Sequence, residues 1–145
     1  MKWKIPLYKV YVDDEDIREV SKVIKRGMDW AIGPEIEQFE KLLANYIGSE
    51  YCLTFNSGTS AGHAAMLALN VKTRDEIIVP SFTFIATAHS LQWQEITPVF
   101  CDIDPRTHNI DPKKVERMIT PRTTGIIGVH VWGRACDVDG LSEIA

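Results

Sequence analysis

Residues 75–84 read DEIIVPSFTF. The apolar run from Glu76 to Val79 has the length and β-branched content of a short buried strand, and Pro80 ends it. Three further segments read as strands, residues 51–55, 96–101 and 124–131. Helical patterns lie between and after them, over residues 59–69, 82–93, 112–118 and 138–145. This alternation predicts an α/β fold, with a mostly parallel sheet that carries helices on both faces.

The first part of the chain shows helical patterns rather than strands. Asp13 or Asp14 can cap a first helix, and Pro34 suits the first turn of a second one. We therefore expect residues 1–50 to form a helical N-terminal segment and residues 51–145 to form the βα units.

Composition and charge indicate a globular protein and argue against nucleic-acid-binding and membrane-spanning proteins. The chain has 145 residues, of which 45% are hydrophobic and 25% charged, which is typical of a globular protein. A net charge of −4 without a basic run gives no support for nucleic-acid binding. No apolar stretch is long enough to cross a membrane, and residues 1–6 lack the apolar core of a signal peptide. Three cysteines without a CxxC pair predict reduced thiols in a cytoplasmic protein.

The segment Asn56–Gly62 joins the first expected strand to a helix. In a parallel sheet such a loop lies outside the carboxyl end of the strand, where ligands bind. Its small residues let the backbone approach an anion, and the free N–H groups of the following helix favour negative charge. The sequence therefore indicates a phosphate site here, although a capped turn without a ligand has the same pattern. It matches neither GxGxxG nor the P-loop motif.

The segment Pro80–Phe84 also leaves a strand at its carboxyl end. An aromatic ring in this place can stack on a planar cofactor that lies above the sheet. Phe82 and Phe84 can equally belong to the core, and the residues by themselves favour that reading.

Taken in order, several segments resemble the DegT/DnrJ/EryC1/StrS family of pyridoxal-phosphate-dependent sugar aminotransferases. The resemblance runs through nearly the whole chain. The segments that carry it are Gly33–Glu40, Asn56–Ala61, Asp75–Phe84, Thr97–Asp104, Asn109–Pro112, Ile119–Thr123 and Val129–Gly133. It implies that residues 1–145 are the N-terminal, incomplete part of the large domain of a fold-type I transferase dependent on pyridoxal 5'-phosphate (PLP).

The resemblance also implies roles for individual residues. Thr59 and Ser60, with the turn at Gly58, would bind the phosphate of PLP. Phe84 occupies the aromatic position that stacks on the pyridine ring, and His130 ends a strand beside the cofactor.

The loop Met28–Pro34 lies near the sugar in such enzymes, so Gly33 and Pro34 are expected at the substrate. The implied reaction moves an amino group, with glutamate as the expected donor, to a nucleotide-linked keto-sugar. Its products would serve cell-surface polysaccharide or secondary-metabolite sugars. The full-length form is expected to be a homodimer with its active site between subunits.

Two groups that this chemistry needs are missing from the chain. The family supplies a lysine for the Schiff base and an aspartate for the pyridine nitrogen later than residue 145. None of the nine lysines follows a strand in a desolvated pocket. We therefore expect the chain to be inactive alone, whether it is a shortened or a naturally truncated form.

A different class of enzyme is the alternative. Asp102-Ile103-Asp104 follows an apolar strand, and a DxD motif there can hold a metal and a nucleotide in a glycosyltransferase. The same residues can instead form a turn in which the carboxylates cap backbone amides. The four histidines, at positions 63, 89, 108 and 130, have no pair at zinc-ligand spacing, so no zinc site is expected. His63 and His89 fall within helices and are read as packing or surface residues. A remnant that only binds or assembles is the third alternative.

Overall fold

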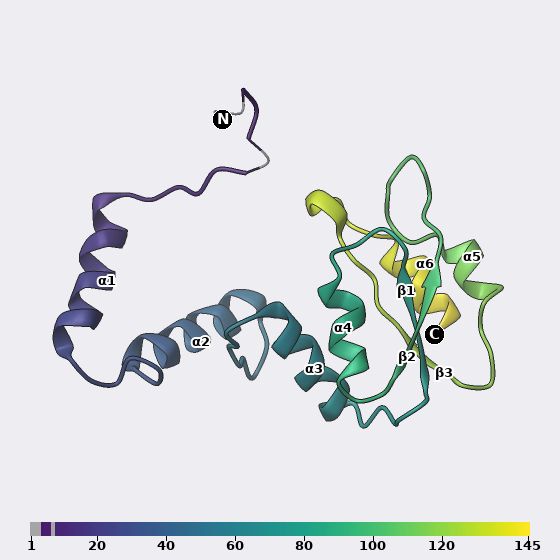
Figure 1. Cartoon of the computed structure of the whole chain (residues 1–145), viewed down its shortest axis with the longest axis horizontal. Helices are drawn as coiled ribbons and strands as arrows, with labels where there is room; N and C mark the ends of the chain where they lie inside the picture. The colour runs from purple at the N-terminus through teal and green to yellow at the C-terminus, as the bar shows by residue number, and fades with distance from the viewer. Residues whose placement is uncertain (1–3, 7) are drawn as a thin grey trace. The chain divides into compact units, whose positions relative to one another are not determined.

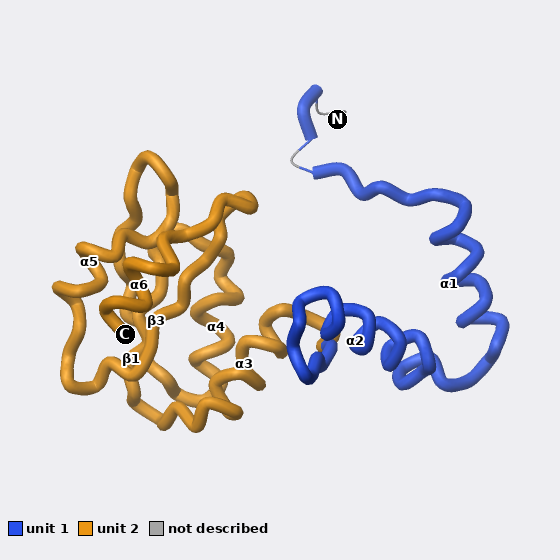
Figure 2. The backbone as a smooth tube through the Cα atoms, turned by 180° about the vertical axis from the view of Figure 1, so that it is seen from behind, with its two compact units in different colours: residues 1–54 blue, residues 55–145 orange. Residues whose placement is uncertain are grey.

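The computed structural model describes residues 4–6 and 8–145. They divide into two compact units, residues 1–54 and 55–145, coloured separately in Figure 2. The helices are α1 (Asp14–Arg26), α2 (Pro34–Ile47), α3 (Gly58–Ala68), α4 (Ala86–Gln92), α5 (Pro112–Glu116), α6 (Val138–Ile144) and the single 3₁₀ turn η1 (Val131–Gly133). The strands are β1 (Glu76–Pro80), β2 (Thr97–Cys101) and β3 (Thr123–Ile126). No helix among these residues is long and apolar enough to cross a membrane.

The first unit holds the two helices that the sequence predicts there. Asp13 caps α1: its carboxylate accepts the N–H groups of Glu15 and Asp16, and the Asp16 side chain accepts the Asp13 N–H in return. Pro34 opens α2, where its missing N–H costs nothing. Gly48 follows α2 with a φ of 80°, a conformation that glycine adopts without strain.

The second unit is built on a three-stranded parallel sheet with the order β2-β1-β3. Figure 1 shows α3 and α4 on one side of this sheet and α5 and α6 on the other. The chain is therefore an α/β protein with a parallel sheet covered on both faces, as the alternating pattern predicts. The central strand β1 is buried along its whole length.

Each face of the sheet has its own apolar core. Ile77 and Val79 of β1 pack with Met66, Leu91 and Ile96 on the α3–α4 side. On the other side, the buried residues around β1 are Ile78, Cys101, Ile110, Val115, Cys136 and Leu141. Successive side chains of a strand point to opposite faces, so these three residues of β1 serve both cores.

The prediction of a strand at residues 51–55 is wrong. These residues form no strand and have no strand partner in the described part of the chain, and Tyr51 and Leu53 are 78% and 76% exposed. The Thr54 N–H donates instead to the Glu40 carboxylate, at 2.8 Å. A strand depends on a ladder of backbone hydrogen bonds with a neighbour, which the apolar pattern of the segment does not supply.

The strand expected at 124–131 is shorter than predicted. Pairing with β1 ends at Ile126, followed by one further hydrogen bond from Ile127 N–H to the Ile78 carbonyl. The Val131 N–H then turns to the side chain of Asn109, at 3.1 Å. The backbone leaves the sheet because its hydrogen bonds are made elsewhere. The helix predicted over 82–93 is likewise shorter, since α4 starts only at Ala86.

We predict that the two cores carry the stability of the second unit. Leu91→Ala should lower the free energy of unfolding by about 2–5 kcal/mol, because Leu91 is fully buried on α4. The matched control is Leu67→Ala on α3, where the side chain is 58% exposed and the loss should stay within about 0.5 kcal/mol. Urea denaturation followed by circular dichroism measures both. Equal losses would contradict the assignment of the core.

A buried carboxylate joins the start of β1 to the segment before β3. Glu76 is 5% exposed and accepts hydrogen bonds from the Thr120 hydroxyl and from Arg122 Nε, the latter at 2.9 Å. Its own N–H donates to the Arg122 carbonyl at 2.8 Å. The Thr120 hydroxyl, and then the Arg122 guanidinium, lower the pKa of Glu76 below the ordinary glutamate value.

This lowered pKa predicts how stability changes in acid. The folded state binds the proton more weakly than the unfolded state, so the contribution of Glu76 is present above the ordinary glutamate pKa of about 4.3. It is lost as the pH falls through the lower folded pKa. Glu76→Gln should lower stability at neutral pH and flatten the decline below about pH 4.3. Glu116→Gln, at an exposed position on α5, should leave the wild-type profile unchanged.

Candidate cofactor site

The start of α3 is the predicted phosphate site. Ser57 caps the helix: its hydroxyl oxygen accepts the Ser60 N–H at 3.1 Å and lies 2.9 Å from the Ser60 hydroxyl. The Ser60 hydroxyl donates to the Asn56 side-chain oxygen at 3.2 Å. The Ala61 N–H donates to the Ser57 carbonyl. The N–H groups of Gly58 and Thr59, the first two of the helix, have no intrahelical acceptor.

The geometry of this helix start suits an anion. Gly58 is exposed, and apart from its chain neighbours and the backbone of its own helix no heavy atom lies within 4 Å of the place where its Cβ would be, so a phosphate can approach the backbone. The partial positive charge of the 11-residue helix and the nearby hydroxyls favour such a ligand. One premise of the sequence argument fails, because the segment before the helix is not a strand. The start of a helix favours an anion whether or not a strand precedes it, so the prediction of a phosphate site stays a prediction.

Close packing fixes α3 against α4. A Cβ on Gly62 would meet the Ser90 Cβ at 3.0 Å and its hydroxyl at 3.1 Å, so a larger residue at position 62 would push the helices apart. Ser90 is buried, and its hydroxyl donates to the Thr87 carbonyl at 3.0 Å. Glycine at position 62 therefore sets the distance between the two helices, and with it the place of the helix start.

Phe84 lies between the carboxyl end of β1 and the start of α4. Its ring is 78% exposed, which leaves it outside both cores and open to a planar ligand. Thr83, beside it, shares a hydrogen bond of 2.9 Å with the Thr87 hydroxyl in the first turn of α4. The reading of Phe84 as a core residue is therefore wrong, because an exposed ring contributes little to a core.

His130 follows β3 by four residues. β1 and β3 are parallel neighbours, so the segments that carry Phe84 and His130 both leave the sheet at the carboxyl end of its strands. The His130 Nδ1 accepts the backbone N–H of Cys136 at 3.0 Å. His130 and Cys136 also line a groove of about 320 Å³ between the end of β3 and α6.

The two predicted substrate residues belong to the first unit. Gly33 is buried in a tight turn before α2, where a Cβ would come within 2.7 Å of Arg26, Asp29 and Glu35 atoms. Arg26 holds this turn through a 2.7 Å ion pair with Glu35 and a hydrogen bond to the Asp29 carbonyl. Its guanidinium lowers the pKa of Glu35. Position 33 therefore requires glycine, and Pro34 starts the helix beside it.

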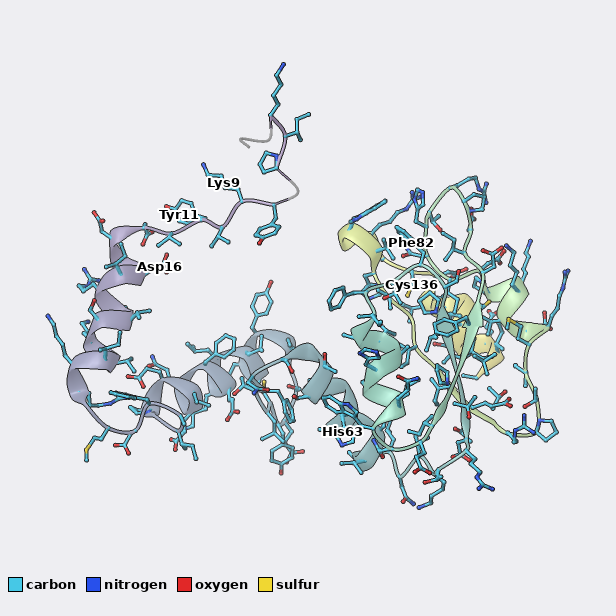
Figure 3. The ribbon with its side chains drawn as sticks, viewed as in Figure 1. Lys9, Tyr11, Asp16, His63, Phe82 and Cys136 are labelled. Atoms are coloured by element: carbon cyan, nitrogen blue, oxygen red, sulfur yellow. The ribbon has the colours of Figure 1, made fainter. Side chains whose placement is uncertain are left out.

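An aromatic cluster escaped the sequence analysis. Phe82, His108 and Trp132 have ring centroids 5.2–6.0 Å apart, with Trp132 packed edge-on against both of the others. Phe82 lies at the upper end of the second unit in Figure 3. His108 and Trp132 have positive φ angles of 61° and 54°, which residues other than glycine rarely adopt. No pattern in the sequence marks such a conformation at a histidine or a tryptophan.

The DxD segment has a structural explanation. The Asp102 carboxylate lies 2.6 Å from Lys114 Nζ, and the Asp104 carboxylate lies 3.1 Å from Arg106 and accepts the Arg106 N–H. These partners lower the pKa of each aspartate. The described residues contain no group of three side chains placed to hold a metal ion. Both carboxylates thus stabilise the turn, as the alternative interpretation of this segment holds.

Comparison with known proteins confirms the family resemblance that the sequence segments indicate. The sequence profile of the DegT/DnrJ/EryC1/StrS aminotransferase family matches residues 10–145. The chain belongs to this family. It is 45% identical over 115 residues to GDP-perosamine synthase of Caulobacter vibrioides, which covers 79% of this chain and 31% of that protein. It is 40% identical over 126 residues to UDP-2-acetamido-2-deoxy-3-oxo-D-glucuronate aminotransferase of Pseudomonas aeruginosa, covering 87% and 35%.

Solved structures of the family have the same fold. GDP-4-keto-6-deoxy-D-mannose-3-dehydratase from E. coli, solved with bound hydrated PLP, superposes with a TM-score of 0.86 at 29% identity. That match covers 96% of this chain and 37% of the dehydratase. The chain thus spans about a third of the length of the relatives it matches. These proteins are fold-type I enzymes, and the parallel sheet with its two helical layers is the part of that fold that this chain contains.

Proposed function

We propose that the protein is a PLP-dependent aminotransferase that moves an amino group onto a nucleotide-linked keto-sugar. An amino acid, with glutamate as the first candidate, supplies the group. The family match and the relatives that act on nucleotide sugars support this class of substrate. The product is an amino sugar for a cell-surface polysaccharide or a secondary metabolite.

Two structural observations together carry the cofactor part of the proposal. The open start of α3 and the exposed ring of Phe84 are the two features that a phosphorylated, planar cofactor needs. The N–H groups of Gly58 and Thr59 and the hydroxyls of Thr59 and Ser60 hold the phosphate, and Phe84 covers one face of the ring. When bound, PLP supplies an electron sink for amino transfer.

The remaining candidates have separate roles in the proposal. His130 donates a hydrogen bond to the ring or to the substrate from the carboxyl end of the sheet. Gly33 and Pro34, in the turn before α2, contribute to binding of the sugar. The active form is a cytoplasmic homodimer. In the proposal, none of residues 1–145 is assigned as the lysine that attaches the cofactor or as the aspartate that holds its pyridine nitrogen.

We predict that Phe84 contributes measurably to cofactor affinity. Phe84→Ala should weaken PLP binding about two- to tenfold, because stacking contributes roughly 0.5–1.5 kcal/mol beyond burial of area. Equilibrium dialysis of the protein against PLP measures the change. Trp93→Ala is the control, because it removes a ring of similar exposure, 59%, at the other end of α4. Equal binding by the Phe84→Ala variant and wild type would remove the ring from the site.

A second prediction concerns the phosphate alone. Thr59→Pro removes one N–H donor from the first turn of α3, where proline is compatible with the helix. The variant should bind PLP at least about tenfold more weakly than wild type, since hydrogen bonds to charged groups contribute roughly 1.5–3 kcal/mol. Thr59→Ser keeps the donor and the hydroxyl, so it should bind like wild type. If the proline variant binds as tightly as the serine variant, the phosphate lies elsewhere.

A further inference from the structure

A single buried side chain holds the loop that carries His130. Asn109 is 2% exposed and follows the turn after β2. Its Nδ2 donates to the carbonyls of Arg134 and Ala135, at 3.0 and 2.9 Å, and its Oδ1 accepts the Val131 N–H at 3.1 Å. The amide thus uses both donors and its acceptor on one loop. The opposite amide orientation would set an oxygen against two carbonyls.

These three hydrogen bonds lie next to both ends of the His130–Cys136 contact. Val131 directly follows His130, and Ala135 directly precedes Cys136, whose N–H donates to His130 Nδ1 at 3.0 Å. A ring nitrogen that accepts a hydrogen bond carries no proton, so the neutral ring has its proton on Nε2. The loop geometry therefore leaves His130 with a donor on the nitrogen that faces away from Cys136.

The turn that presents Asn109 is itself well supported. The Asn109 carbonyl accepts the Asp104 N–H at 2.9 Å, and Ile103 pairs with Ile110 across the turn. A second link between the two loops runs from Arg134 Nη1 to the Arg106 carbonyl at 3.0 Å. The strained residues His108 and Trp132 lie directly beside this network. Strain of this kind persists only where surrounding contacts enforce it.

We propose that Asn109 is a positioning residue of the cofactor site, which acts by fixing the Nε2–H tautomer and the ring orientation of His130. Its importance for catalysis rests on the proposed function, in which His130 donates a hydrogen bond to the cofactor or the substrate. The geometric part does not, because it rests only on contacts between residues of this chain.

The tautomer can be read directly by NMR. We would label the histidine rings of the chain with ¹⁵N and record long-range ¹H–¹⁵N correlations at about pH 8.5, roughly two units above the ordinary histidine pKa. In the wild type, Nδ1 of His130 should appear unprotonated and Nε2 protonated. A wild-type spectrum with the proton on Nδ1 would overturn the proposal, whatever any variant does.

The decisive variant is Asn109→Asp, which keeps the size of the side chain and replaces both donors by an acceptor. In this variant His130 should become a mixture of tautomers, and hydrogen exchange of the Cys136 amide should speed up about tenfold or more. The ring ¹⁵N signals of His89 should stay unchanged. Leu91→Ala loosens the opposite core without touching this loop and should leave the His130 signals as they are. If Leu91→Ala changes them as much as Asn109→Asp does, the effect is general loosening and the positioning role is refuted.

A parallel titration of the wild-type protein with PLP keeps the two proposals apart. The predicted tautomer without PLP binding supports the positioning role of Asn109 and counts against the proposed function. If the wild type binds PLP but the His130 tautomer is unchanged in Asn109→Asp, the proposed function is supported and the positioning role of Asn109 is refuted.

Discussion

The second unit depends on the burial of β1 between two layers of helices. Ile77 and Val79 face α3 and α4, Ile78 faces α5 and α6, and all three are at most 3% exposed. Because successive residues of one strand serve opposite cores, neither layer can shift without exposing part of β1. The segments that leave the carboxyl ends of the strands are held in place by the same packing. The candidate site is built from these segments and from the start of α3.

Polar contacts complete what the two cores begin. Loops at the end of a parallel sheet carry backbone groups that the sheet no longer pairs, and each buried group needs a partner. Asn109 serves this need for the 131–135 loop, and Ser57 serves it for the start of α3. At Gly58 and Thr59 the donors have no intrahelical acceptor. In the proposed function the cofactor phosphate accepts these hydrogen bonds.

Sequence patterns predicted the layers of the fold better than the ends of its elements. The apolar run of β1, the cap at Asp13, the helix start at Pro34 and the alternation of strands with helices are local signals, and the structure confirms each of them. The extended segment 51–55 was misread because strand formation depends on a partner that the segment itself does not contain. The early end of β3 has a similar cause, since a side chain distant in sequence, Asn109, accepts the backbone N–H of Val131 in the segment that follows the strand.

In the candidate site, too, residues with a local sequence signal could be predicted, and residues that depend on long-range contacts could not. Gly58, Thr59 and Ser60 could be proposed as a phosphate site from the sequence, because small residues at the start of a helix leave backbone N–H groups open to an anion. The positive φ angles of His108 and Trp132 could not, because long-range contacts impose them on residue types that do not favour them. Asn109 belongs to a quoted family segment, yet only its three hydrogen bonds to the neighbouring loop reveal what it does.

The central claim is that the start of α3 binds the phosphate of a planar cofactor beside Phe84. The most direct measurement is a map of amide and aromatic NMR shifts during separate titrations with inorganic phosphate and with PLP. We predict saturable shifts of the Gly58, Thr59 and Ser60 amides with both ligands, and of the Phe84 ring with PLP alone. Shifts that avoid residues 58–60, or that gather at the cationic side chains of Lys113 and Lys114 instead, would contradict the account.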